Sequence, residues 1–572
     1  MMRVRWLALV AVLAMVAAAC GDTAGDTTTT AASEETTATT MAPEDTTATT
    51  MAPEEEPSEF EAMALEAGGC DYGGRVESIT ALDEHTVEFA LCGPHPAFLA
   101  QIAFGVFGIQ PAEHLEATGG APLDNPVGTG PYVLQEWVRG DSVVYQRFDD
   151  YYGDPAPHQT AVLRWATEGA QRLLELQSGN VDGITFPSTD DYPTIEEDPD
   201  LELINKPEPN IFYVGFTNTF APFDDPLVRR AVALGIDRQR LVDTFYPPGS
   251  VVASHFTPCT VEFGCEGDSW YDFDAEEGRA LLEEAGFPDG FETTIAYRDV
   301  FRGYLPEPGA VANDISAQLE ENLGITATVE AIESGEFIQS TTQGQYEGIH
   351  LLGWTGDYPH ITNFLDFHFN ADNPQFGVND PSYADPLDEA STQADPDPSL
   401  YAEANNAIRE FVPMVPIVQS VTSFAASADV DGAYAPPWGQ VQFQEWDNGE
   451  DTLVFMQGNE PISLYCADES DGESLRACAQ VVEALYDYDT EGNVVPQLAE
   501  ECAPNDDLSV WTCTLREGVL FHDGSTLDAN DVVVSMTAGL DAASPLHTGN
   551  SGAFDYYSYL WNGLINAPEE EG

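Results

Sequence analysis

The stretch VLFHDGSTLDANDVV, residues 519–533, contains a complete strand–turn–helix unit. Its apolar residues Val519 to Phe521 predict a short strand, and the His-Asp-Gly that follows predicts a turn. Asp528 suits the N-cap of a helix whose first turn carries Asp531. Such a unit cannot bury its apolar faces alone, and only about 40 residues follow it. We therefore expect it to pack against an earlier part of the chain.

The first 20 residues have the features of an export signal. Arg3 and Arg5 precede an apolar run, Trp6 to Ala19, that is too short to span a membrane as a helix. Small residues directly before Cys20 resemble the bacterial lipobox, which implies that Cys20 is lipidated and begins the mature protein. The alternative is an ordinary signal in which Cys20 is incidental.

Residues 21–58 are mostly Thr, Ala, Glu and Pro, and the sequence ATTMAPE occurs at 38–44 and again at 48–54. This segment has almost nothing to bury, so we expect a disordered, solvated tether. The remaining residues, about 510, are too many for one core and predict two or three lobes.

The chain is strongly acidic, with 99 Asp and Glu against 18 Lys and Arg, a net charge of −81 and Lys206 as its single lysine. This charge disfavours nucleic acid and anionic lipid surfaces as partners. It does not by itself indicate a cationic ligand, because a saline habitat explains it equally well.

The cysteines other than Cys20 number eight and fall close together in sequence, which for an exported chain indicates disulfides. No CxxC motif or Cys/His cluster indicates zinc. Local pairing is the simplest connectivity, and the first and last pairs could each join neighbouring strands. The candidate pairs are Cys70 with Cys92, Cys259 with Cys265, Cys466 with Cys478, and Cys502 with Cys513.

Along the body, short strands alternate with capped helices, which predicts an α/β fold. The segments predicted as strand pairs, helices or helix–strand units are 75–92 (hairpin), 125–153 (two strands), 170–186 (helix, strand), 224–246 (helical), 274–287 (helix), 309–332 (helix, strand) and 347–369 (strand, then a polar and aromatic loop).

The wording and order of these segments resemble the family 5 extracytoplasmic solute-binding proteins, the peptide- and nickel-binding receptors of ABC importers. The resemblance spans almost all of residues 70–565. It rests on NPVGTGPY, WVRGD, YYGDPAP, LLELQSGNVD, FYVGFTNTFAPFDDPLVRRAVALGIDR, ALLEEAGF and GWTGDYPHITNFL. It implies a two-lobed periplasmic-binding-protein-like fold of the type II, large peptide-binding class, with an interlobe cleft and a hinge.

The segment order departs from the family once. Segments like 460–464, 481–500 and 511–536 come first in the family, and here they come last. Each segment occurs once, so we interpret the chain as a circular permutation, with the old termini fused near 445–455 and new ends between about 565 and 70. The alternative is a fused or misassembled frame with an orphan fragment, which would expose aggregation-prone apolar segments.

The resemblance then implies the lobes. Lobe I is residues 60–213 together with 420–568, the second part corresponding to the family's N-terminal segment, and lobe II is 214–419. The chain would cross between them at 213–218 and 415–424, two apolar strand-like runs suited to a hinge.

A cleft that encloses a zwitterionic peptide must supply a carboxylate for the ammonium and cationic or amide donors for the carboxylate. By resemblance, Asp357 anchors the peptide amine, with Trp354 and Tyr358 beside it, and Arg302 grips the peptide carboxylate. The resemblance also places GNEPISLY (458–465), with Glu460 and Ser463, along the cleft wall.

Each assignment has a structural alternative. Asp357 could cap the turn before Pro359, and Trp354 could be a core residue. Arg302 could pair locally with Asp299 or Glu307.

Other chemistries lack support in the sequence. His360 and His368 are too far apart for a tight metal pair, so we predict no metal and no cofactor. His522 fits a turn, and VGTGP lacks the Lys-Ser/Thr ending of a phosphate loop. No GxSxG, HExxH or paired-carboxylate site indicates an enzyme.

The sequence therefore predicts a monomeric, lipid-anchored receptor on the outer face of a bacterial membrane. It would capture a di- or oligopeptide-like solute and deliver it to an ABC permease with its ATPase subunits. The alternatives are a nickel or metal-chelate receptor, an oligosaccharide receptor of the same fold, and a secreted hydrolase.

Overall fold

The computed structural model describes residues 60–206, 209–300, 302–369, 373–393 and 395–568. The predicted signal, Cys20 and the tether lie outside these residues. No helix in the described part of the chain combines the length and apolar character needed to cross a membrane.

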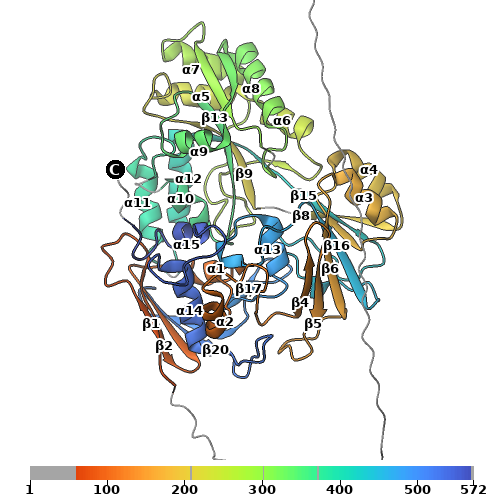
Figure 1. Cartoon of the computed structure of the whole chain (residues 1–572). Helices are drawn as coiled ribbons and strands as arrows, with labels where there is room; N and C mark the ends of the chain where they lie inside the picture. Colours follow the sequence, from red (N-terminus) through yellow and green to blue (C-terminus); the bar gives the residue numbers. More distant parts are fainter. Residues whose placement is uncertain (1–59, 207–208, 301, 370–372, 394, 569–572) are drawn as a thin grey trace, which may run out of the picture. The chain divides into compact units, whose positions relative to one another are not determined.

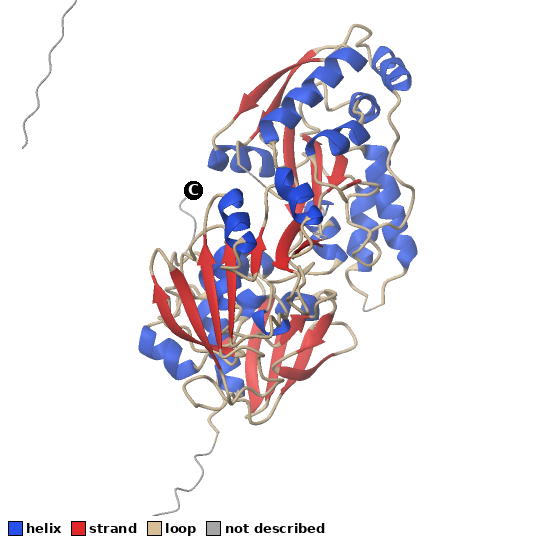
Figure 2. Cartoon of the chain, turned by 90° about the vertical axis from the view of Figure 1, so that its right-hand side faces the viewer, coloured by secondary structure: helices blue, strands red, loops and turns tan. Residues whose placement is uncertain are grey.

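Three large sheets and one small strand pair organise the described residues (Figures 1 and 2). The five-stranded sheet has the order β1-β2-β3-β20-β19, the seven-stranded sheet β4-β5-β6-β16-β7-β15-β8, and the six-stranded sheet β10-β14-β9-β13-β11-β12. The strands are β1 (Ala64–Glu66), β2 (Val76–Asp83), β3 (Thr86–Leu91), β4 (Tyr132–Val138), β5 (Ser142–Arg147), β6 (Thr160–Trp165), β7 (Gly183–Thr185), β8 (Leu201–Lys206), β9 (Asn210–Phe216), β10 (Val251–Val252), β11 (Glu292–Tyr297), β12 (Thr326–Ala331), β13 (Ile349–Thr355), β14 (Met414–Gln419), β15 (Thr422–Ser427), β16 (Thr452–Gln457), β17 (Tyr486–Tyr488), β18 (Val494–Pro496), β19 (Ala499–Pro504) and β20 (Val510–Leu515).

Helices lie between and beside these strands, as the α/β prediction requires. They are α1 (Phe98–Ile102), α2 (Ala112–Thr118), α3 (Gly169–Gln177), α4 (Tyr192–Glu197), α5 (Pro226–Gly235), α6 (Arg238–Phe245), α7 (Ala275–Glu284), α8 (Pro308–Leu323), α9 (Ser334–Thr342), α10 (Leu365–Phe369), α11 (Pro381–Ala390), α12 (Pro398–Phe411), α13 (Gly472–Cys478), α14 (Ala529–Leu540) and α15 (Asp555–Leu560), with short 3₁₀ turns at η1 (Gly105–Phe107), η2 (Thr189–Asp191), η3 (Ile361–Asn363), η4 (Phe443–Glu445) and η5 (Cys466–Asp468).

The end of the chain forms the interior of sheets that the early residues begin. β20 pairs antiparallel with β3, placing Trp511 opposite Phe89. β16 lies between β6 and β7 and is parallel to both. In Figure 1 the red β1 and β2 accordingly lie beside the blue β20 and α14.

The stretch 519–533 packs as expected against earlier residues. The backbone N–H of His522 donates to the Gly128 carbonyl (2.9 Å), and that of Ala529 donates to Glu84 (2.9 Å). Asp528 and Asp531 form a capping box at the start of α14, and Asp531 also accepts from the backbone N–H of Ala112 (2.8 Å).

Two local predictions need correction. Residues 519–521 contribute only an isolated bridge, Leu520 to Thr526, because this segment turns back on itself before α14. The helical segment predicted over 224–246 divides into α5 and α6, since the side chain of Asp237 accepts from the Arg240 N–H and begins a second helix.

The chain passes from the seven-stranded to the six-stranded sheet between β8 and β9 and returns between β14 and β15. The two crossings are joined by hydrogen bonds between Asn210 and Ser420, from the Ser420 N–H to Oδ1 (2.9 Å) and from Nδ2 to the Ser420 hydroxyl (3.1 Å). The first crossing comes a few residues before the predicted 213–218, which lies largely within β9.

All four predicted disulfides are present, and the local pairing is confirmed. Cys502 and Cys513 lie directly opposite each other on β19 and β20, so this bond joins neighbouring strands as expected. The bonds are Cys70 to Cys92, Cys259 to Cys265, Cys466 to Cys478, and Cys502 to Cys513.

The bond between Cys70 and Cys92 corrects part of the expectation, because neither cysteine lies in a strand. Cys70 is in the bend between β1 and β2, and Cys92 directly follows the last residue of β3. The strand ladder of the predicted hairpin 75–92 ends with Leu91 opposite Val76, and the Cys92 N–H still donates to the Arg75 carbonyl (2.7 Å). The Gly-Pro that comes next cannot extend the ladder, since proline has no backbone N–H to donate. The bond thus ties a loop to the end of the hairpin.

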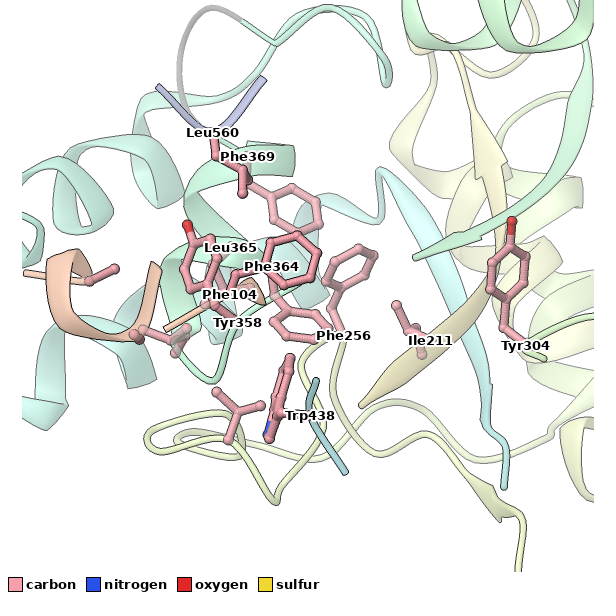
Figure 3. Close-up of a cluster of buried hydrophobic side chains, with 14 of the residues drawn as sticks. Phe104, Ile211, Phe256, Tyr304, Tyr358, Phe364, Leu365, Phe369, Trp438 and Leu560 are labelled. Carbon is pink, nitrogen blue, oxygen red and sulfur yellow. The ribbon is translucent and has the colours of Figure 1, made fainter. Parts of the chain in front are cut away.

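The main hydrophobic cluster contains side chains from the beginning, middle and end of the described residues. Figure 3 shows part of it, with Phe104, Phe364, Trp438 and Leu560 among the labelled residues. Residues far apart in sequence are therefore held by one continuous apolar cluster.

Candidate functional site

A cavity of about 540 Å³ lies where the six-stranded sheet meets α15. We call it the aromatic cavity, because many of its walls are aromatic rings. Its lining includes Tyr213 from β9, three side chains that follow β11, the end of β13 with the residues that follow it, and two side chains of α15. The residues are Tyr213, Arg298, Arg302, Tyr304, Ile338, Thr342, Leu352, Gly353, Trp354, Thr355, Asp357, Phe367, His368, Gln375, Tyr556 and Tyr559.

The aromatic wall is built from two distant parts of the chain. The Trp354 ring stacks on Phe367, with centroids 4.7 Å apart, and Phe367 meets Tyr559 edge-on at 5.0 Å. Tyr556 packs edge-on against Phe104 at 4.8 Å. We call residues 452–568 the tail of the chain. Because Tyr556 and Tyr559 both come from α15, the tail completes this wall.

Asn363 holds two of the predicted ligand residues in place. Its Oδ1 accepts from the Trp354 indole N–H (3.2 Å) and from the backbone N–H of Asp357 (2.9 Å). Its Nδ2 donates to the Asp357 carboxylate (3.2 Å). Asn363 itself is buried, so the indole and the carboxylate are fixed relative to each other.

Asp357 is a half-buried carboxylate, and within the described residues no Lys, Arg or His forms an ion pair with it. Burial raises the pKa of Asp357 to about 7, although the Asn363 hydrogen bond acts in the opposite direction. Burial is the main cause of the raised pKa of the Tyr559 hydroxyl, and the Asp357 carboxylate raises it further. The negative charge of Asp357 is thus poorly compensated by the described residues.

Two arginines line the same cavity. Arg298 donates to the Tyr304 hydroxyl (3.2 Å) and to the Ser334 hydroxyl (3.4 Å). Desolvation lowers the pKa of Arg302, and the positive charge of Arg298 lowers it further. This part of the cavity therefore favours an anion.

The loop that carries Arg302 is anchored to the second crossing between sheets. The Ser420 hydroxyl donates to the Gly303 carbonyl (2.6 Å), and the Leu305 N–H donates to the Arg302 carbonyl (2.9 Å). The tight turn holds the arginine at the cavity.

The structure brings Asp357, Arg302 and Trp354 together, and it places the other three predicted ligand residues elsewhere. Tyr358 is buried and lines a neighbouring cavity of about 230 Å³. Glu460 accepts from the backbone N–H of Gly140 (3.1 Å). Ser463 is buried and donates to Glu469.

Sequence reasoning missed Arg298, Asn363 and the two tyrosines of α15. Arg298 precedes Arg302 by four residues in a chain that has few cations, which was an available signal. The sequence DYYSYL (555–560) is rich in tyrosine, but nothing in it indicates which rings face a ligand.

The residues offer little to a metal ion. Within the described chain, the one group with suitable spacing is His255, Cys259 and Cys265, and its two cysteines form a disulfide. His368 is buried and its Nδ1 lies 2.8 Å from the Phe364 carbonyl, and burial lowers its pKa to about 3.

Comparison with known families gives one match that covers most of the chain. The family described as bacterial extracellular solute-binding proteins, family 5 Middle, matches residues 30–376 and 493–559. The dipeptide-binding protein of Escherichia coli (strain K12) is 27% identical over 382 residues, 64% of this chain and 71% of that protein. Heme-binding protein A of Haemophilus influenzae is 27% identical over 379 residues, 64% of this chain and 69% of that protein.

Solved structures agree with this match. HbpA2 from Haemophilus parasuis superposes with a TM-score of 0.59 at 27% identity, covering 64% of this chain and 74% of that one. The dipeptide binding protein of Pseudoalteromonas sp. SM9913 in complex with Met-Leu gives 0.53 at 25% identity, covering 65% and 75%. The prediction of a two-lobed α/β fold of the periplasmic-binding-protein type is confirmed.

Proposed function

The chain belongs to the family 5 bacterial extracellular solute-binding proteins, and we propose that its aromatic cavity captures a short peptide by its two charged ends. Asp357 would bind the ammonium group, and Arg302 with Arg298 would bind the terminal carboxylate. The relatives whose names refer to dipeptides support this ligand class.

One observation carries the proposal: a half-buried carboxylate without an ion-pair partner among the described residues faces the same cavity as two guanidinium groups. A buried charge is costly unless it is paired. A zwitterion would place its ammonium beside Asp357 and its carboxylate beside the two arginines at once.

Aromatic rings that line the same cavity define the rest of the ligand. Trp354, Phe367 and Tyr559 form a continuous aromatic surface. Burying apolar ligand surface against it contributes about 25 cal/mol per Å². We therefore expect apolar or aromatic peptide side chains to bind better than acidic ones, which the overall negative charge also disfavours.

We propose that ligand binding closes two lobes about the crossings near Asn210 and Ser420. Lobe I would comprise residues 60–206 with 420–568, and lobe II residues 210–419, because β9 (Asn210–Phe216) pairs within the six-stranded sheet. Ser420 contacts both Asn210 and the loop of Arg302, so one residue would link the hinge to the anion-binding loop.

We also propose that the order of segments is a circular permutation of the family's order. The pairing of β20 with β3 and of β16 with β6 supports this, because the tail occupies interior positions of sheets begun by early residues. An independent module would not supply those strands.

In the cell, the protein would be exported, anchored through Cys20 to the outer face of the membrane, and would deliver its peptide as a monomer to an ABC permease and ATPase. Family members are solute-binding proteins, and we propose no catalytic role for this chain.

The test is native mass spectrometry of protein purified without refolding, followed by calorimetric titration. We expect a retained peptide, or saturable one-to-one binding of an apolar dipeptide such as Met-Leu. Ni²⁺, heme and an oligosaccharide serve as competing probes. Binding of one of these, with none of several dipeptides, would replace the proposal with the corresponding receptor class.

A further inference from the structure

The carboxylate of Asp468 accepts several hydrogen bonds from the loop that leads into α15. Asp468 lies in η5, between the bonded cysteines Cys466 and Cys478, and is buried. Its Oδ2 accepts from the backbone N–H groups of Ser551 (2.5 Å) and Gly552 (2.8 Å). Its Oδ1 accepts from the Phe554 N–H (2.7 Å) and the Ser551 hydroxyl (2.9 Å).

The next residue holds the same loop a second way. Glu469 accepts from Asn550 Nδ2 (3.1 Å) and from the hydroxyl of Ser463. The loop fits closely around the carboxylates: a Cβ on Gly549, whose φ is +53°, would collide with the side chain of Asp468. We call Asp468, Glu469 and residues 549–554 the carboxylate clamp.

The clamp fixes the start of α15. Phe554, the residue before the helix, is buried, has a left-handed backbone (φ 45°) and stacks on His547 at 4.3 Å. From this start, Tyr557 points into the core against Phe107 (4.8 Å), and Tyr556 and Tyr559 line the aromatic cavity. Any rotation of α15 would therefore move both cavity tyrosines.

We propose that Asp468 is a positioning residue for ligand binding, which acts through α15 by setting Tyr556 and Tyr559 against the aromatic cavity. The inference rests on the proposed function, because it concerns the same cavity. Asp468 does not line that cavity, so its effect on affinity must pass through the helix.

The test is a double-mutant cycle measured by calorimetric titration of the full chain with Met-Leu. Asp468→Asn replaces one acceptor oxygen by an amide NH2 group that faces backbone N–H donors, and we expect the affinity to fall by about tenfold or more. In the Tyr556→Ala/Tyr559→Ala background, the same substitution should change the affinity less than about twofold, because the side chains through which it acts are gone.

Asp489→Asn is the matched control. Asp489 also accepts two backbone N–H groups, from Glu491 and Asn493 (both 2.9 Å), in a turn that does not line the aromatic cavity. The Asp489→Asn substitution should leave the affinity for Met-Leu unchanged. Amide hydrogen exchange should show faster exchange over 549–563 in Asp468→Asn and no such change in Asp489→Asn.

The outcomes separate the two claims. If the unmodified protein binds no peptide, the proposed function fails, and hydrogen exchange still reports whether the clamp holds the loop. If the unmodified protein binds Met-Leu and Asp468→Asn binds it equally well, the positioning role is wrong. An equal loss of affinity in both backgrounds would also overturn it, since the effect would then not pass through the tyrosines.

Discussion

Asp357→Asn is expected to lower the affinity for a zwitterionic dipeptide by about 100-fold or more, because the ammonium would then be buried without a counter-charge. Asparagine has the same shape and can still accept the hydrogen bond from Asn363. The loss would therefore report the charge of Asp357 and not the geometry of the loop. Calorimetric titration at pH 8 measures it.

The same substitution should make the empty protein more stable at pH 8. The folded pKa of Asp357 is about 7, above its ordinary value of 3.8, so the folded protein binds this proton more tightly than the unfolded chain does. Its contribution to stability is then favourable at low pH and is lost as the pH rises from about 4 to about 7. Removing the charge should raise the free energy of unfolding by at most about 4 kcal/mol above pH 7 and should leave it unchanged near pH 4.

Thermal unfolding of the empty protein at pH 8 and pH 4 checks this dependence. Asp154→Asn, at an exposed position, is the control for the general effect of removing one negative charge from a chain of net charge −81. If Asp357→Asn is less stable than the unmodified protein at pH 8, the carboxylate has a structural role in the turn. In that case a loss of binding would no longer identify it as the ammonium site.

Ending the chain before Thr452 is expected to abolish folding of the whole body. The truncation removes β16 from between β6 and β7, and it removes β20 from the edge of β3. It also takes away the buried side chains of Phe455, Trp511 and Val532. Unpaired strand edges and exposed apolar surface should then lead to aggregation.

Circular dichroism and size-exclusion chromatography of the truncated chain measure this outcome. The control ends the chain at Pro568, which retains every element described above. A truncated chain that stays monomeric and unfolds cooperatively would contradict the role given to the tail, because residues 60–451 would then form a complete body without it.

Much of the fold follows from local signals in the sequence. Asp528, with Asp531 three residues later, is a capping pattern that needs no tertiary information, and the structure has it as a capping box. The strand 86–91 alternates in burial as its sequence does, and cysteines close in sequence form the disulfides. That Cys92 lies just beyond its strand was harder to foresee, because strand ends depend on the pairing partner. The packing of the tail followed from the need to bury its apolar faces.

The candidate site was less predictable, because it is assembled from tertiary contacts. Asp357 and Arg302 stand in recognisable motifs, but Tyr556 and Tyr559 reach the cavity only through the orientation of α15. Ser463 lies in a segment expected along the cleft, and its hydroxyl is instead engaged by Glu469. The division of 224–246 into α5 and α6 depended on one aspartate, Asp237, which could equally have remained within a single helix.

The most direct test of the central claim, that one cavity closed by the tail binds both ends of a peptide, is a calorimetric comparison of Met-Leu with its N-acetylated and C-amidated forms. We predict that acetylation and amidation each weaken binding by about tenfold or more, and that Asp357→Asn no longer distinguishes Met-Leu from its acetylated form. Equal affinity of the unmodified protein for all three peptides would contradict the account.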